Sequence, residues 1–130
     1  MKKIILLALL FMITEVSAQS HLHVMTFNIR YNTMADSSNA WPYRKDKVAS
    51  QILFHDAHII GVQEALHGQM TDLQERLPQF KYAGVGRDDG KEKGEYSAIF
   101  YDTTRLQSLQ TKTFWLSETP EVAGSKSWDA

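Results

Sequence analysis

An amide and a carboxylate stand at two points where an apolar stretch of the chain ends. Asn28 closes the stretch 21–28, and Glu64 closes the short run 59–64. Carboxylate and amide oxygens are suited to a hard divalent cation such as Mg²⁺. If the two side chains met, they could hold a hydrated Mg²⁺ together with a phosphate oxygen. Each residue taken alone also fits the solvated end of a strand, which is the commoner role of such side chains.

Whether these side chains meet depends on the elements that carry them. Residues 59–64 have the length and composition of a strand buried on both faces, and residues 21–28 alternate roughly in polarity, as a strand does. Residues 43–55 have apolar side chains at helical spacing and would cross between the two strands. Ligand sites of α/β proteins lie at the carboxyl ends of strands, so neighbouring strands would bring Asn28 and Glu64 to one edge.

The rest of the chain is predicted to complete a mixed α/β arrangement. A second helix is expected over about residues 66–77, ended by Pro78, and a short strand over residues 80–86. Residues 95–101 and 106–116 are predicted to pair as a β-hairpin. The last residues, rich in serine and with a proline and a glycine, are expected to be irregular.

A third carboxylate, Glu95, stands at the start of that predicted hairpin. It can approach the other two side chains only if the hairpin packs beside the first sheet. The charged loop 87–94 directly before it could hold a phosphate or a metal, and its two glycines and polar composition fit a solvated turn equally well. No histidine stands at a strand end as a general base, and the nucleophile-elbow and P-loop motifs are absent from the sequence.

Histidines and a tryptophan offer weaker alternatives. His21 and His23 would share a strand face, but two histidines alone do not make a metal site. His55 and His58 could form a catalytic pair, although histidines at helix ends are far commoner without such a role. Trp41 could be a platform for a substrate or a cover over the core, and large aromatic side chains are mostly buried.

Residues 1–18 have the features of a secretory signal peptide. They begin with two lysines, continue with an apolar run over residues 4–13 and end with a small-residue cleavage site at Ala18. The apolar run is too short to span a bilayer, so no transmembrane segment is expected. We expect export to the periplasm or the medium, and a mature chain of residues 19–130 that forms a single domain.

Charge and cysteine content exclude several classes of site. The chain has 14 basic and 15 acidic residues, and removing Lys2, Lys3 and Glu15 with the signal peptide leaves 12 against 14. A near-neutral chain gives no electrostatic argument for nonspecific nucleic-acid binding. The sequence has no cysteine, which excludes thiolate catalysis, cysteine zinc sites and disulfides, so stability must come from the core.

Several motifs, in order along the chain, resemble the endonuclease/exonuclease/phosphatase superfamily, which has the deoxyribonuclease I-like fold. They cover nearly all of residues 22–130, and the last two resemble an exported bacterial branch of that family. The motifs are Met25–Arg30, Gly61–Glu64, Gly94–Tyr101, Phe114–Pro120 and Gly124–Asp129.

The resemblance implies a role for each matching side chain. Glu64 would be a direct ligand of Mg²⁺ or Mn²⁺, and Asn28 would join the metal site and position the phosphate and the metal-bound water. Glu95 would hydrogen-bond a catalytic histidine and so fix its tautomer and charge. Arg30, which follows the family's asparagine, could touch the phosphate.

The resemblance also implies an α/β (α+β) four-layer sandwich about twice as long as this chain, which would cover about its first half. The family's central histidine, its Asp-x-Asn pair and its closing Asp-His would lie beyond residue 130. From this we expect a truncated gene model or fragment rather than the alternative, a natural half-length protein. The fragment would expose one side of its sheet, carry an incomplete site and be inactive alone.

The function implied is that of an exported, metal-dependent hydrolase of phosphodiesters or phosphomonoesters. Its substrate would be a sugar phosphate, a phospholipid head group or a nucleic acid, and the near-neutral charge leans against the last. We expect a monomer when full length. The alternative is a non-catalytic exported binding module on the same scaffold, because fold does not fix function. An Asp-x-Asn and a terminal Asp-His further along the chain would favour the enzyme.

Overall fold

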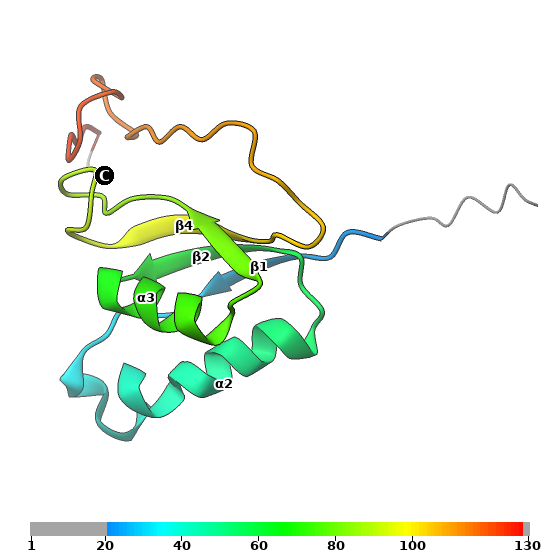
Figure 1. Cartoon of the computed structure of the whole chain (residues 1–130). Coiled ribbons are helices and arrows are strands. Elements are labelled where there is room, and N and C mark those ends of the chain that lie inside the picture. Colours follow the sequence, from blue (N-terminus) through cyan, green and yellow to red (C-terminus); the bar gives the residue numbers. More distant parts are fainter. Residues whose placement is uncertain (1–20, 129–130) are drawn as a thin grey trace, which may run out of the picture.

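The computed structural model describes residues 21–128, which fold into one four-stranded sheet with two helices against one of its faces (Figure 1). The predicted signal peptide lies outside the described residues. Within that part of the chain, no helix is long and apolar enough to cross a bilayer. In chain order the elements are β1 (Val24–Asn28), the 3-10 helix η1 (Met34–Asn39), α2 (Trp41–Phe54), β2 (Ile59–Ala65), α3 (His67–Arg76), β3 (Phe80–Ala83) and β4 (Tyr96–Asp102).

The sheet has the strand order β1-β2-β4-β3. Strands β1 and β2 are parallel, and α2 forms the crossover between them, with Val24 opposite Ile59 and Asn28 opposite Gln63. Strand β4 pairs antiparallel with both β2 and β3. The prediction that the first two strands are neighbours is therefore confirmed, and their carboxyl ends lie at the same edge of the sheet.

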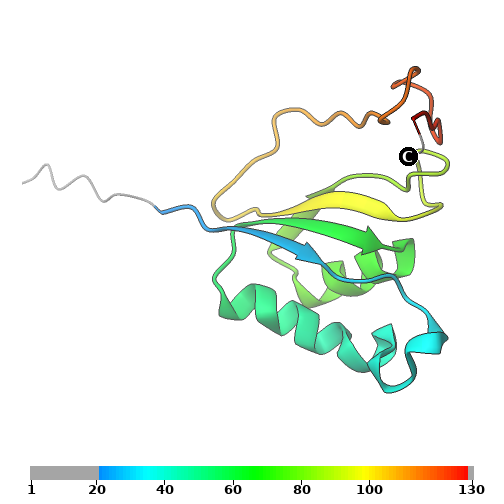
Figure 2. The same ribbon diagram turned by 180° about the vertical axis from the view of Figure 1, so that it is seen from behind.

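The two helices cover one face of the sheet and enclose the core with it (Figures 1 and 2). A proline in its first turn starts α2, a position where the missing N–H is no loss. Helix α3 ends at Arg76, and its C-cap Leu77 directly precedes Pro78, which disfavours helical backbone at that residue. The largest fully buried core side chains are Phe100, Ile29, Ile52, Ile60, Met70, Leu73, Leu77 and Val62. Trp41 is also buried, which confirms its role as a cover over the core.

The face of the sheet away from the helices is open. Ile60 and Val62 of β2 are buried against the helices, whereas Ile59 is only half-buried. On the neighbouring strands Val24 is 68% and Ile99 50% exposed. The prediction that β2 is buried on both faces is thus wrong for residues 21–128, and the expectation of one exposed side is confirmed. These residues form one sheet layer and one helix layer of the expected four-layer α/β sandwich.

The predicted hairpin between residues 95–101 and 106–116 is wrong. Strand β4 already has β2 on one edge and β3 on the other, so no edge is left for a third partner. Residues 106–116 have no strand assignment and pass over the open side of the sheet instead (Figure 2). The segment then returns to the loop before β4, where Trp115 Nε1 donates to the Arg87 carbonyl oxygen over 2.6 Å.

Candidate functional site

Asn28 and Glu64, the amide and the carboxylate at the tips of β1 and β2, are in direct contact. Asn28 Nδ2 donates to Glu64 Oε1 over 2.7 Å, across 36 residues of sequence. The contact follows from the parallel register, which sets Asn28 opposite Gln63, the residue before Glu64. The sequence-based expectation that these two side chains share one edge of the sheet is therefore confirmed. Their catalytic and metal-binding roles remain predictions.

A β-bulge in β2 sets the direction of the Glu64 side chain. The pairing of β2 with β4 shifts by one residue between Val62 and Ala65. Val62 pairs with Ala98 and Ala65 with Tyr96, so β2 has one residue more than β4 between these two pairs. Glu64 has φ of 61°, in the left-handed region that non-glycine residues seldom occupy. Bulges often redirect a side chain beside a functional site, and such backbone strain is held only where the surroundings fix it.

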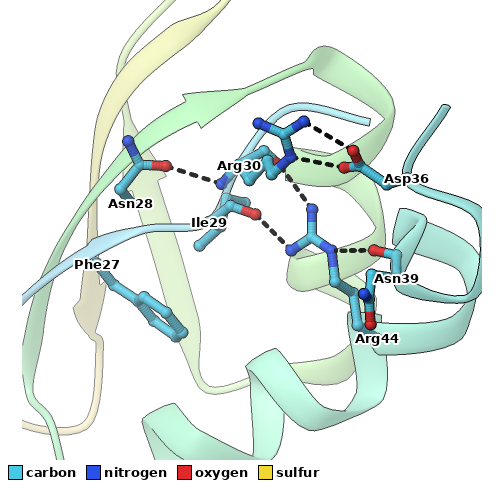
Figure 3. A pocket seen from close by; sticks show the side chains of 7 residues that line it. All are labelled: Phe27, Asn28, Ile29, Arg30, Asp36, Asn39 and Arg44. Carbon is cyan, nitrogen blue, oxygen red and sulfur yellow. Dashed lines mark hydrogen bonds and ion pairs between the residues drawn. The ribbon is translucent and has the colours of Figure 1, made fainter. Parts of the chain in front are cut away.

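Arg30 and Asp36 form an ion pair directly beyond Asn28 (Figure 3). Arg30 donates from Nε and Nη2 to the two Asp36 carboxylate oxygens, over 2.6 and 2.7 Å. This pairing raises the pKa of Arg30 and lowers the pKa of Asp36. The Arg30 backbone N–H donates to Asn28 Oδ1 over 2.8 Å, so the Asn28 amide is fixed at both ends.

Arg44 of α2 holds the same turn from the helix side. Its guanidinium donates to the carbonyl oxygens of Ile29, Arg30 and Asn39, which lie on the segment after β1 and at the end of η1. Burial lowers the pKa of Arg44. Together with Asn28 and the Arg30–Asp36 pair these groups line an open pocket of about 510 Å³ beside the strand tip (Figure 3).

Glu95 stands at the same edge of the sheet, directly before β4, the strand next to β2. It precedes Tyr96, which pairs with Ala65, the residue after Glu64. The Glu95 carboxylate accepts from Arg87 Nη1 over 3.0 Å, and its carbonyl oxygen accepts from the Arg87 backbone N–H. Among residues 21–128 its side-chain partner is thus an arginine, and the orientation of a histidine by Glu95 remains a prediction.

The donor set at this edge fits a hard divalent cation. Glu64 Oε1 is held by Asn28, and Glu64 Oε2 makes no hydrogen bond or ion pair with any of the described residues. A half-buried carboxylate with one oxygen fixed and the other free is a suitable anionic ligand for Mg²⁺ or Mn²⁺. The Asn28 oxygen faces the Arg30 N–H and its nitrogen faces Glu64, so in this arrangement Asn28 orients the carboxylate.

A second cluster of possible ligands lies at the opposite edge of the sheet. His23, Asp56 and His58 bring ligand atoms within 4.8 Å of one another, but His23 precedes β1 and His58 precedes β2. His58 Nδ1 accepts the His23 backbone N–H over 2.9 Å, so the proton of the neutral ring is on Nε2. A metal on Nε2 would need that proton on Nδ1. The cluster therefore does not fit a metal ion held by His58 Nε2, the ring nitrogen that faces Asp56.

Three residues around the site were not found by reasoning from the sequence. They are Asp36, Arg44 and Gln69, the last a buried glutamine that bonds the backbone on both sides of the site. A signal existed for Gln69 alone, because it stands three residues after the residue that precedes α3, where a glutamine often caps the helix. Asp36 and Arg44 contact the irregular segment that follows β1, and no sequence periodicity predicts its course.

Comparison with solved structures shows close relatives of this fold. An endonuclease/exonuclease/phosphatase from Bacteroides vulgatus matches with 46% sequence identity and a TM-score of 0.84, over 86% of this chain and 43% of that one. A mannosyl-6-phosphatase from Bacteroides thetaiotaomicron matches with 45% identity and a TM-score of 0.81, over 85% of this chain and 42% of that one. This chain thus spans about two fifths of the length of these proteins.

A more distant structure shares the fold alone. A humanized D. rerio TDP2 matches with 15% identity and a TM-score of 0.59, over 75% of this chain and 37% of that one. No protein-family model matches the chain, and no curated protein matches it either. The family assignment rests on the solved structures that are nearly half identical in sequence over most of residues 1–130. By that identity and by its mixed sheet with two helices, the chain belongs to the endonuclease/exonuclease/phosphatase superfamily.

Proposed function

We propose that the full-length protein is a metal-dependent hydrolase of phosphoester bonds, and that Glu64 is a direct ligand of its Mg²⁺ or Mn²⁺ ion. The observation that carries the proposal is the Asn28–Glu64 hydrogen bond, which fixes one carboxylate oxygen and leaves the other free. The close relatives in the same superfamily support it. The bound cation would supply positive charge for the negative charge that develops on the phosphoryl group.

The residues of this chain have distinct parts in that reaction. Asn28 holds the Glu64 carboxylate and is placed to hydrogen-bond a phosphate oxygen or the attacking water. Arg30 keeps Nη1 without a partner among residues 21–128 while its other two nitrogens, Nε and Nη2, donate to Asp36, so Nη1 can contact a phosphate. Glu95 would orient a catalytic histidine, once that ring replaces or joins Arg87 as its partner.

A sugar phosphomonoester is the substrate class with the most support. One close relative, 45% identical, is a mannosyl-6-phosphatase, and close relatives within a superfamily more often share a substrate class than distant ones do. A net charge of −1 over the chain gives no attraction for a nucleic-acid backbone. Phospholipid head groups carry the same phosphoester chemistry and are the second class to be tested.

The experiment is a substrate panel on the full-length protein. Mannose 6-phosphate, other hexose phosphates, a glycerophosphodiester and single- and double-stranded DNA are each incubated with Mg²⁺, with Mn²⁺ and with EDTA. We expect phosphate release from a sugar phosphate that depends on added metal and stops with EDTA. Turnover that persists after complete removal of metal would contradict the metal role. The absence of turnover on every phosphoester would favour the binding module.

A further inference from the structure

Gln69 is a buried polar residue whose whole side chain is used in contacts with the backbone. It lies in the first turn of α3, and only 1% of it is exposed. Its Oε1 accepts from the backbone N–H groups of Asn32 and Leu66, over 2.8 and 3.1 Å, and its Nε2 donates to the Arg30 carbonyl oxygen over 2.9 Å. A buried amide is stable only when it is hydrogen-bonded in this way.

The partners of Gln69 lie on the two segments that leave the candidate site. Arg30 and Asn32 follow Asn28 by two and four residues, and Leu66 follows Glu64 by two. One side chain therefore ties the segment after β1 to the segment after β2, directly behind the Asn28–Glu64 contact. These two segments are not hydrogen-bonded as strands beyond Asn28 and Gln63, apart from one bond between the Ile29 N–H and the Gln63 carbonyl oxygen.

The backbone on both sides needs such a constraint. Arg30 has φ of 54° and Glu64 has φ of 61°, and a non-glycine residue in the left-handed region costs on the order of 1 kcal/mol or more. Such conformations persist only where the surroundings over-determine them. Gln69 binds the carbonyl group of Arg30 itself and the N–H group two residues after Glu64, so it contacts both strained turns.

We infer that Gln69 is a positioning residue, which holds the Asn28 and Glu64 side chains in register although it touches neither. This inference rests on the proposed function only in that the Asn28–Glu64 contact forms the metal site. Loss of the Gln69 amide would leave the Asn32 and Leu66 N–H groups without their side-chain acceptor and would free the two turns to move apart. The Asn28–Glu64 hydrogen bond would then lengthen or break, and the affinity for the cation would fall.

The test uses Gln69→Met, which keeps the shape and removes the hydrogen bonds, in the full-length protein. Gln69→Glu is a second variant that keeps the acceptor for Asn32 and Leu66, loses the donor to Arg30 and places a carboxylate against the Arg30 carbonyl oxygen. The matched control is Gln74→Met on the same helix, whose Nε2 donates to the Phe80 carbonyl oxygen over 2.6 Å, away from the site. Both Met variants lose hydrogen bonds from a side-chain amide to the backbone, so a merely structural effect should appear in both.

Two readouts separate this inference from the proposed function. The first readout, which needs no metal, is the chemical shift of the Asn28 side-chain amide protons in a nitrogen–proton NMR correlation spectrum. In Gln69→Met we expect the proton bonded to Glu64 to shift towards the value of a free amide, with a smaller shift in Gln69→Glu and none in Gln74→Met. The second is the Kd for Mn²⁺, which we expect to rise about tenfold or more in Gln69→Met alone, as for other groups that support metal ligands.

Each result has one meaning. An Asn28 signal that stays at its wild-type position in folded Gln69→Met, or that moves equally in Gln74→Met, overturns the inference whether or not metal binds. A wild-type protein that binds no Mn²⁺ overturns the metal role of Glu64, while the Asn28 signal still decides the role of Gln69. An intermediate effect in Gln69→Glu supports the inference, because that variant keeps two of the three hydrogen bonds.

Discussion

Asn28 Nδ2 lies 2.7 Å from Glu64 Oε1, and this contact joins the carboxyl ends of two adjacent parallel strands. The amide uses its other end to accept the Arg30 N–H. The carboxylate is thus oriented by a side chain that is itself held by the backbone. Substitution of either Asn28 or Glu64 should therefore disturb this arrangement.

Substitution of the candidate ligand should abolish most metal-dependent turnover. Glu64→Gln removes the negative charge and replaces the free oxygen or turns it away, while the side chain keeps its size. We expect kcat/KM with Mg²⁺ to fall by about 10²-fold or more, as for the loss of one strong electrostatic group at a reacting centre. The control is Glu75→Gln, an exposed carboxylate on α3. Unchanged turnover at saturating metal would rule out ligation by Glu64.

Conversion of the amide to an acid should make stability dependent on metal. Asn28→Asp places a second carboxylate within hydrogen-bond distance of Glu64, where two negative charges repel each other and raise the pKa of at least one. Without metal we expect the variant to be less stable than the wild type at pH 7, and the difference to shrink as the pH falls towards 4 and one carboxyl is protonated. Added Mg²⁺ should restore stability at pH 7. Urea unfolding with and without Mg²⁺ measures both effects. A loss of stability that added Mg²⁺ does not restore would contradict the metal site.

The contact between the two helices should be sensitive to acid through Asp72. Burial acts to raise the pKa of Asp72, but hydrogen bonds from Lys45 Nζ and Trp41 Nε1, each over 2.8 Å, outweigh it and leave this pKa below its ordinary value. A carboxyl with a lowered pKa contributes stability above about pH 3.9, its value in the unfolded chain, and loses it as the pH falls through the folded-state pKa. Asp72→Asn should therefore be less stable than the wild type at pH 7, and the difference should shrink below pH 4. A difference independent of pH in urea unfolding would refute this.

Two glycines should respond to alanine in opposite directions. A Cβ on Gly86 would overlap the Lys93 carbonyl oxygen across the loop that leads to Glu95, so Gly86→Ala should destabilise the fold by about 1–3 kcal/mol, as overpacking does. Gly68, in the first turn of α3, has open space around it. Gly68→Ala should stabilise by about 0.5 kcal/mol, because the unfolded chain loses freedom. Thermal unfolding of the pair measures this, and a stabilised Gly86→Ala would refute the close packing of the loop.

The sequence was sufficient to predict both helices, the strands up to β3 and the meeting of Asn28 with Glu64. These features depend on local periodicity and on the rule that parallel neighbours end at one edge. The pairing of β4 could not be predicted in the same way. Residues 106–116 carry apolar side chains at strand-like spacing, yet Leu109 is 91% and Phe114 62% exposed. The edge of β4 that these residues would need is occupied by β3, which stands earlier in the chain. Only the folded sheet shows this pairing.

The surroundings of the site were predicted less well than its centre. The meeting of Asn28 and Glu64 follows from their places at the ends of two neighbouring parallel strands. Gln69 and Arg44, by contrast, act on backbone groups, which every residue has, so residue types reveal at most the helix-capping position of Gln69 and nothing of Arg44. The bulge at Glu64 likewise leaves no signal in the residue types of β2, because it is a property of the pairing with β4.

The bulge has a consequence for how this strand can change over time. Because one extra residue separates Val62 from Ala65 in the pairing with β4, Gln63 and Glu64 both stay out of the core while Ala65 returns to it. Loss of a single residue there would restore an even alternation and remove the bulge that now sets the direction of the acid side chain. Homologous proteins should therefore keep the number of residues between Val62 and Ala65 even where Gln63 itself is replaced.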